Sequence, residues 1–174
     1  IVEKPMAVNL DEADRMFAAA ERNRVKLVQG HSKIYSPEIS EIRAVIQSGR
    51  LGRVIQIISW NFNDWLQRPR LASEVDTRIG GGVVFRQGPH QVDIVRYLGG
   101  GRVKNVRAVA GRSDNNFAAE GDYTAFMEFD DGTPATLAFN AYGYFNIAEL
   151  TWGIGEGAKL HSDADAAKPK KRIT

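Results

Sequence analysis

The sequence contains no cysteine among its 174 residues, and it is also poor in proline, with 6 residues. Without thiols the chain cannot build a disulfide scaffold or a thiolate metal site, and this composition is typical of a reducing compartment, so we expect a cytoplasmic protein. It also lacks an apolar run of the roughly 18 residues that a membrane-spanning helix requires. The first residues do not have the basic and apolar regions of a signal peptide. We therefore predict no membrane partner.

Charge of one sign is not in excess either. The 23 basic and 21 acidic residues give a net charge of +2, and the dense basic run is KPKKR at 168–172. Because nucleic-acid-binding domains carry clustered positive charge, we predict no nucleic-acid partner. What remains is an ordinary globular composition, 43% hydrophobic, with a length that suits one domain. We place this domain at residues 1–160 and expect a flexible tail at 161–174, where the sequence is polar and aperiodic.

Apolar periodicity predicts helices in the first part of the chain and strands in the last part. Helices are expected at 10–23, from Pro37 to a stop at Gly49, and after the glycines at 80–82 as far as Gly99. Strands are expected at 25–28, 54–62, 102–112, 123–129, 134–142 and near 148–154, with a hairpin turn at 130–133. This order predicts the α+β class, an open, largely antiparallel (mixed) β-sheet with helices on one face.

The strand at 54–62 is predicted to have one apolar face and one face turned to water. Ile58 and Trp60 share the apolar face, whereas Ser59 and Asn61 point the other way. Since the predicted helices cover only one side of the sheet, large apolar side chains on the other side need a partner surface. We therefore predict a homodimer through the open sheet. The side chains on which this expectation rests are Trp60, Phe62, Phe126 and Phe139.

Polar side chains that suit chemistry are concentrated in three segments: EKP at 3–5, GHSK at 30–33 and GGGVVFRQGPHQVD at 80–93. Each lies at a predicted strand end or helix start, so we expect them to form one edge of a cleft. Oxidation of an alcohol requires a base, a donor that stabilises the developing alkoxide, and an electron acceptor. His90 suits the base, and Lys4 suits the donor or a proton relay. From these residues alone, a surface turn at EKP and a structural histidine remain open as alternatives.

The order of these motifs resembles the Gfo/Idh/MocA family, the glucose-fructose oxidoreductases and inositol dehydrogenases. The resemblance runs from about Glu3 to Gly157. It includes EKP before a helix, then GHSKIYSPEISEIRAVIQSGRLGRV, then GGG followed by G-x-H-x-x-D, with Gly88, His90 and Asp93. It implies that the chain is the C-terminal substrate domain of a Rossmann-type oxidoreductase. Such a dehydrogenase oxidises a hydroxyl of a small diol, polyol or sugar-like substrate.

The resemblance also implies how cofactor and site are shared within the whole protein. NAD or NADP is bound mainly by an N-terminal domain, and no G-x-G-x-x-G after a first strand occurs in this chain. The isolated chain is therefore expected to be inactive, and the full-length enzyme active. The family places Glu3, Lys4 and Pro5 on the cofactor side, with a Lys–Pro bond that is often cis. It places Lys4 and His90 in the catalytic positions.

One position departs from the family pattern. Where the family commonly has aspartate in GGG-x-x-x-Asp-x-x-x-His, this chain has Arg86. An arginine suits bidentate pairing with a substrate carboxylate, and His31 and Lys33 would extend this anion-binding edge. With the run F-R-Q-G-P-H, this resembles the phthalate cis-dihydrodiol dehydrogenase branch, which implies an anionic substrate. The alternative is that Arg86 pairs with an internal acid such as Asp93 or Glu74.

Two other classes of function remain open. The same fold can serve as a non-catalytic regulatory or dimerisation module, because a fold does not determine chemistry. A metal hydrolase built on His31, His90, His161 and nearby carboxylates is the other class. The chain lacks the H-x-x-x-H and H-E-x-x-H spacings that such enzymes use, so we predict no metal site.

Overall fold

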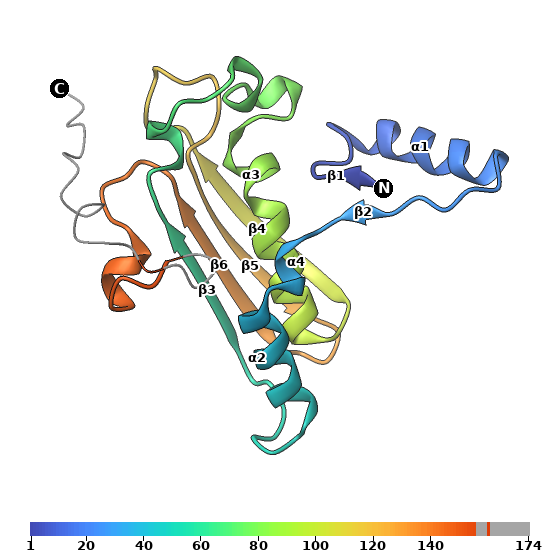
Figure 1. The fold of residues 1–174 in the computed structure, drawn as a ribbon, viewed down its shortest axis with the longest axis vertical. Helices are drawn as coiled ribbons and strands as arrows, with labels where there is room; N and C mark the ends of the chain where they lie inside the picture. The colour runs from blue at the N-terminus through green and yellow to red at the C-terminus, as the bar shows by residue number, and fades with distance from the viewer. Residues whose placement is uncertain (156–159, 161–174) are drawn as a thin grey trace.

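The computed structural model describes residues 1–155 and residue 160, and Figure 1 shows their arrangement. A sheet with helices packed on it makes up most of the fold, and a smaller unit of two short strands and one helix lies beside it (Figure 1). The tail that we expect at 161–174 lies outside the described residues. In the described part of the chain, no helix is long and apolar enough to cross a membrane.

Within the described residues the main sheet has four strands in the order β3-β6-β5-β4. The strands are β3 (Ile57–Phe62), β4 (Val103–Gly111), β5 (Asp122–Phe129) and β6 (Pro134–Asn140). β3 runs parallel to β6, whereas β5 pairs antiparallel with both β4 and β6. The predicted turn joins β5 to β6, with Gly132 at a φ of 84° and the Asp131 carboxylate accepting a hydrogen bond from the Thr133 amide. The expected open, mixed sheet is confirmed.

Helices cover one face of this sheet, as predicted. They are α2 (Pro37–Gln47), α3 (Gly82–Arg86) and α4 (Gly88–Gly99). α4 packs against β3 and β6, α3 packs against β5, and α2 lies against α4 (Figure 1). The fully buried side chains between the two layers include Val83, Val95, Phe129 and Leu137.

The opposite face of the sheet is largely open, although Phe145 packs on Phe62 at the end of β3, with 6.0 Å between the ring centroids. Ile58 and Trp60 of β3 are 58% and 56% exposed, and Phe126 of β5 is 47% exposed. Phe139, which we expected on this face, is instead 2% exposed and stacks on Tyr123 in the core, with 5.8 Å between the ring centroids. The exposed apolar surface of this face therefore includes side chains of β3 and β5, and Val109 of β4, which is 72% exposed, but not Phe139.

The polar face of β3 is half-buried beneath α4, whereas the sequence predicted that it faces water. Gln91 of α4 is 6% exposed and lies over this face, where its Nε2 donates to the carbonyl and the hydroxyl of Ser59, both at 2.9 Å. Its Oε1 accepts a hydrogen bond from the Tyr123 hydroxyl. Because these hydrogen bonds satisfy the buried polar atoms, a polar strand face can pack beneath a helix.

This buried network gives the stability of the fold a pH dependence. Burial raises the pKa of the Tyr123 phenol above its usual value of about 10. Since the unfolded chain loses this proton near pH 10 and the folded chain keeps it, the free energy of unfolding should fall by up to about 1.4 kcal/mol per pH unit above that pH.

Tyr123→Phe should therefore show two effects. At neutral pH it should cost about 1–3 kcal/mol, because the buried Gln91 oxygen loses its donor. Above about pH 10 its stability should decline less steeply than that of the wild type, because the raised pKa is gone. Urea unfolding of both proteins from about pH 8 to pH 11 measures the two effects, and parallel stability curves would contradict the second.

The smaller unit contains β1 (Val2–Glu3), α1 (Leu10–Arg22) and β2 (Gln29–Gly30). β1 and β2 form a parallel pair. α1 begins where the sequence predicted, because the Asn9 side chain accepts a hydrogen bond from the Glu12 amide at 2.9 Å and so caps the helix.

Apolar side chains of this unit are exposed. The buried strand predicted at 25–28 is wrong, because β2 starts only at Gln29, and Val25 and Val28 are 61% and 53% exposed. The apolar face of α1 is similarly open, since Phe17 is 53% exposed.

The helix predicted after the glycines is interrupted at Gln87 (φ −115°, ψ −38°), between α3 and α4. Pro89 has no amide hydrogen to donate back into α3, which favours a break at this point. Arg86 therefore ends one helix, and His90 lies in the first turn of the next. α4 ends at the predicted glycines, with Gly100 in the left-handed region at φ 76°.

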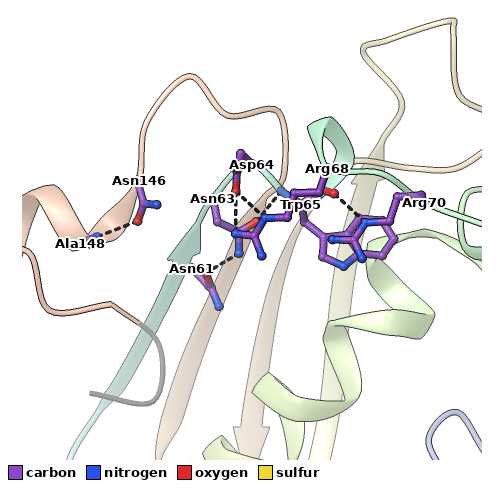
Figure 2. A network of polar contacts seen from close by, with 8 residues as sticks. All are labelled: Asn61, Asn63, Asp64, Trp65, Arg68, Arg70, Asn146 and Ala148. Carbon is purple, nitrogen blue, oxygen red and sulfur yellow. Dashed lines mark hydrogen bonds and ion pairs between the residues drawn. The ribbon is translucent and has the colours of Figure 1, made fainter. Parts of the chain in front are cut away.

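The strand predicted near 148–154 is also wrong. Residues Ile147–Leu150 form a 3-10 turn. Figure 2 shows the Asn146 side chain accepting a hydrogen bond from the Ala148 amide, at 3.0 Å. The Glu149 carboxylate accepts one from the Asn146 amide at 3.3 Å. This capping box satisfies the amides that start a helical turn and stabilises it over a strand.

Candidate active site

Lys4 and His31 are brought together by the pairing of β1 and β2. In this parallel pair Glu3 lies opposite Gly30. The residues that follow, Lys4 and His31, therefore leave the same end of the two strands next to each other. The Nδ1 atom of His31 is buried and has no hydrogen-bond partner among the described residues. The EKP and GHSK segments thus meet, as the sequence predicted.

Lys4 also contacts the segment that follows the three glycines. Its Nζ donates a hydrogen bond to the carbonyl of Arg86 at 2.5 Å. The first glycine of this segment packs against the same region, because a Cβ at Gly80 would lie 3.4 Å from Val8 Cγ2 and 3.9 Å from Pro5 Cγ. The Lys4–Pro5 peptide bond is cis, as the family resemblance implied.

His90 lies in the first turn of α4, which is held from several sides. Its amide donates to the carbonyl of Gln87 at 3.1 Å. The next residue, Gln91, is anchored to β3 through Ser59. The short helix η1 (Lys33–Tyr35) packs against α4. The segment that carries Lys33 therefore lies beside the helix that carries His90.

The Arg86 side chain makes no hydrogen bond or ion pair with a described residue, and its Nε is buried. Neither of the two acids named as alternative partners, Asp93 and Glu74, pairs with Arg86. Asp93 Oδ2 is buried without a hydrogen-bond partner among the described residues, and the Glu74 carboxylate lies 3.7 Å from Arg70 Nη1. The alternative prediction, that Arg86 pairs with an internal acid, is therefore wrong for the described part of the chain. A half-buried guanidinium that has no partner among the described residues is suited to bind an anionic group of a ligand.

Arg70, in the loop after β3, differs from Arg86 because its side chain contacts other residues of the domain. Figure 2 shows it stacked on Trp65, with Cζ 4.2 Å from the ring centroid and Nε donating to the Trp65 carbonyl at 2.9 Å. Burial lowers the pKa of the Arg70 guanidinium, although the Glu74 carboxylate acts in the other direction. Arg70 is therefore a structural residue whose contacts are made within the domain.

Two polar residues that support the site were missed by the sequence reasoning. Gln91 interrupts the apolar pattern of α4, and this is the signal that could have identified it as a buried polar residue. Glu120 belongs to the connection between β4 and β5, and its carboxylate accepts a hydrogen bond from the Val84 amide of α3 at 2.9 Å. No sequence pattern links Glu120 to the glycine segment, because the contact depends on the tertiary fold.

The three predicted segments are thus in contact through β1 with β2, through Lys4 with α3, and through η1 with α4. Their ammonium and imidazole groups can stabilise an alkoxide and move a proton. This donor set fits an alcohol and the amide edge of a nicotinamide. No described segment is a glycine-rich turn between a strand and a helix that would hold a pyrophosphate.

The described residues contain no group of three or more histidine, cysteine, aspartate or glutamate side chains that could hold a metal ion. His161, the third histidine of the metal-hydrolase alternative, lies outside these residues.

Comparison with known proteins identifies the family. Residues 39–151 match the GFO/IDH/MocA C-terminal domain. The chain therefore belongs to this family, as the order of its motifs indicated.

Two curated relatives show how much of a longer protein the chain represents. It is 44% identical over 156 residues to the 1-carboxy-3-chloro-3,4-dihydroxycyclohexa-1,5-diene dehydrogenase of Comamonas testosteroni, which covers 90% of this chain and 39% of the relative. It is 31% identical over 175 residues to the myo-inositol dehydrogenase Hyg17 of Streptomyces leeuwenhoekii, which covers 96% of this chain and 51% of the relative. The chain thus spans about two fifths to one half of these relatives.

Solved structures share the fold. A protein of Bordetella bronchiseptica RB50 assigned as a dehydrogenase superposes with a TM-score of 0.86 at 38% identity, covering 99% of this chain and 46% of that chain. The WlbA dehydrogenase of Bordetella pertussis, solved in complex with NADH and UDP-GlcNAcA, superposes with a TM-score of 0.73 at 23% identity, covering 83% of this chain and 45% of that chain. The second similarity concerns the fold alone.

Proposed function

We propose that this chain is the substrate-binding domain of an NAD(P)-dependent dehydrogenase that oxidises one hydroxyl of a carboxylated cis-dihydrodiol. The observation that carries the proposal is the bond from Lys4 Nζ to the Arg86 carbonyl. It joins the proposed catalytic lysine to the helix end that bears a cation without an internal partner. The relative from Comamonas testosteroni, whose name describes a carboxylated dihydroxycyclohexadiene, supports this choice of substrate.

The proposed roles follow from the chemistry of each side chain. His90 removes the hydroxyl proton as the general base, and the Lys4 ammonium stabilises the oxygen from which that proton leaves. The nicotinamide, bound mainly by the remainder of the protein next to Glu3, Lys4 and Pro5, supplies the hydride acceptor. Arg86 binds the substrate carboxylate, and His31 and Lys33 extend this binding edge.

The open apolar side of α1 and of the segment before β2 fits this division of the protein. In the proposed full-length enzyme the cofactor domain covers these side chains, of which Phe17 and Val28 are each 53% exposed. The isolated chain would then lack both the cofactor site and this contact, so we expect it to be inactive.

A substrate assay of the full-length protein tests the proposal. With NAD or NADP, a carboxylated cis-dihydrodiol should be oxidised with a kcat/KM at least about 100-fold above that for myo-inositol, because only the diol has an anion for Arg86. The absorbance of the reduced nicotinamide measures both reactions. If neither compound is oxidised with either cofactor, the catalytic assignment is wrong and a regulatory or dimerisation module becomes the better account. A preference for the neutral polyol would keep the dehydrogenase and reject the anionic substrate.

We also propose that two copies of the protein associate through the open face of the sheet. The face carries Ile58, Trp60 and Phe126 with half of their surface exposed, and a stable interface buries about 1,200–2,000 Å². Placing a charge there by Trp60→Lys should convert the dimer to a monomer in light scattering. Leu51→Lys is the matched control, because Leu51 is an 81% exposed apolar residue in the turn before β3, outside the strands of the sheet. A wild-type protein that is monomeric at high concentration would contradict the dimer.

A further inference from the structure

Glu120, just before β5, holds the glycine segment at the start of α3. Its Oε1 accepts a hydrogen bond from the Val84 amide at 2.9 Å, and its Oε2 accepts one from the Thr77 hydroxyl. Its backbone carbonyl accepts a third from the Val83 amide at 3.3 Å. One residue therefore binds the segment on both sides of its three glycines.

The glycine at position 82 makes this contact possible. Gly82 has a φ of 82°, in the left-handed region that favours glycine, and a Cβ at this position would lie 2.2 Å from Glu120 Oε1. Any other residue would thus collide with the carboxylate and strain the backbone. In this chain the third glycine of the motif leaves space for a protein carboxylate.

Hydrogen bonds continue from Glu120 to the proposed site. The Val83 carbonyl accepts a bond from the Gln87 amide at 2.8 Å, and the Gln87 carbonyl accepts one from the His90 amide at 3.1 Å. At the end of α3, the Arg86 carbonyl accepts the bond from Lys4 Nζ. Because α3 has five residues, a shift at its first turn is transmitted directly to the carbonyl that holds Lys4.

We propose that Glu120 is a positioning residue, which fixes α3 and thereby the placement of Lys4, Arg86 and His90. Its effect on turnover rests on the function proposed above. Glu120 acts through its two carboxylate oxygens, and the length of its side chain sets how far these oxygens lie from its backbone. Glutamine should therefore replace it, because the glutamine Oε1 can accept the Val84 bond and its amide group can donate to the Thr77 hydroxyl. Aspartate should not, because it is one methylene shorter.

The test compares variants of the full-length enzyme. Glu120→Ala and Glu120→Asp should lower kcat for the proposed diol by about tenfold or more, whereas Glu120→Gln should stay within about threefold of the wild type. Amide hydrogen exchange at Val84 should accelerate by about tenfold or more in the first two variants, while exchange in the β5 and β6 pair stays unchanged. Glu41→Ala, which removes an exposed carboxylate of α2, is the control and should change neither quantity.

A readout at Lys4 separates this proposal from the proposed reaction. Reductive methylation followed by mass spectrometry should modify Lys4 faster in Glu120→Ala than in the wild type, relative to the exposed Lys26, whether or not the enzyme oxidises diols. If the exchange and methylation changes occur without turnover of any diol, the positioning role stands and the proposed function fails. If turnover occurs but Glu120→Ala leaves kcat, Val84 and Lys4 unchanged, or accelerates exchange equally across the whole core, the positioning role is overturned.

Discussion

Replacing His90 by alanine in the full-length enzyme should lower kcat for the diol by about 10²–10⁴, with a much smaller change in KM. The reason is that the variant has no group in the first turn of α4 that can take the hydroxyl proton. Because a general base acts only in its deprotonated form, a rise of kcat between about pH 5 and 8 that reports this base in the wild type should be lost in the variant. Steady-state rates of cofactor reduction across this pH range measure both effects.

Arg96→Ala is the control for His90→Ala. Arg96 lies on the same helix with an exposed side chain, so its removal should leave both kcat and the pH profile unchanged. If His90→Ala keeps kcat within a factor of about three, His90 is not the base. Loss of the same pH dependence in Lys4→Ala would then assign the proton transfer to Lys4.

Features that local chemistry determines could be predicted from the sequence. The start of α1 follows from Asn9, whose side chain caps the helix. The turn between β5 and β6 follows from Gly132, which adopts the positive φ that such turns require. The fold class could be predicted as well, because helical and strand periodicities occupy separate parts of the chain.

Features that depend on tertiary contacts were predicted wrongly. The alternation along β3 predicted a face turned to water, but Gln91 of α4 donates hydrogen bonds to Ser59 on that face. Val25 and Val28 predicted a buried strand, whereas more than half of each side chain is exposed. In both cases the periodicity was visible, but the identity of the covering surface was not.

The proximity of the candidate site residues could not be predicted from local sequence patterns either. Lys4 and Arg86 are 82 positions apart, and no periodicity joins them, so their proximity was implied only by the resemblance to a family. The support from Glu120 was not implied by the resemblance either. Its carboxylate enters through the space left by Gly82, and this is visible only in three dimensions.

Arg86→Ala should lower kcat/KM for a carboxylated cis-dihydrodiol by about 2–4 kcal/mol, or about 30-fold to 700-fold, the usual scale for losing a charged partner in a binding site. Oxidation of a neutral polyol should change little, because no carboxylate is present for the guanidinium. Arg86→Lys should recover only part of the loss, since an ammonium cannot form the bidentate pair. The ratio of kcat/KM values for the two substrates is the measurement.

Arg70→Ala provides the contrast that makes the result specific. Arg70 stacks on Trp65 and lies near Glu74, so its removal should lower the melting temperature while the ratio between anionic and neutral substrates stays the same. Arg86 has no such partner among the described residues, so Arg86→Ala should show the reverse, with a changed ratio and an unchanged melting temperature. An Arg86→Ala enzyme that loses stability and keeps its substrate preference would reject the carboxylate contact and leave the dehydrogenase assignment to be judged by His90.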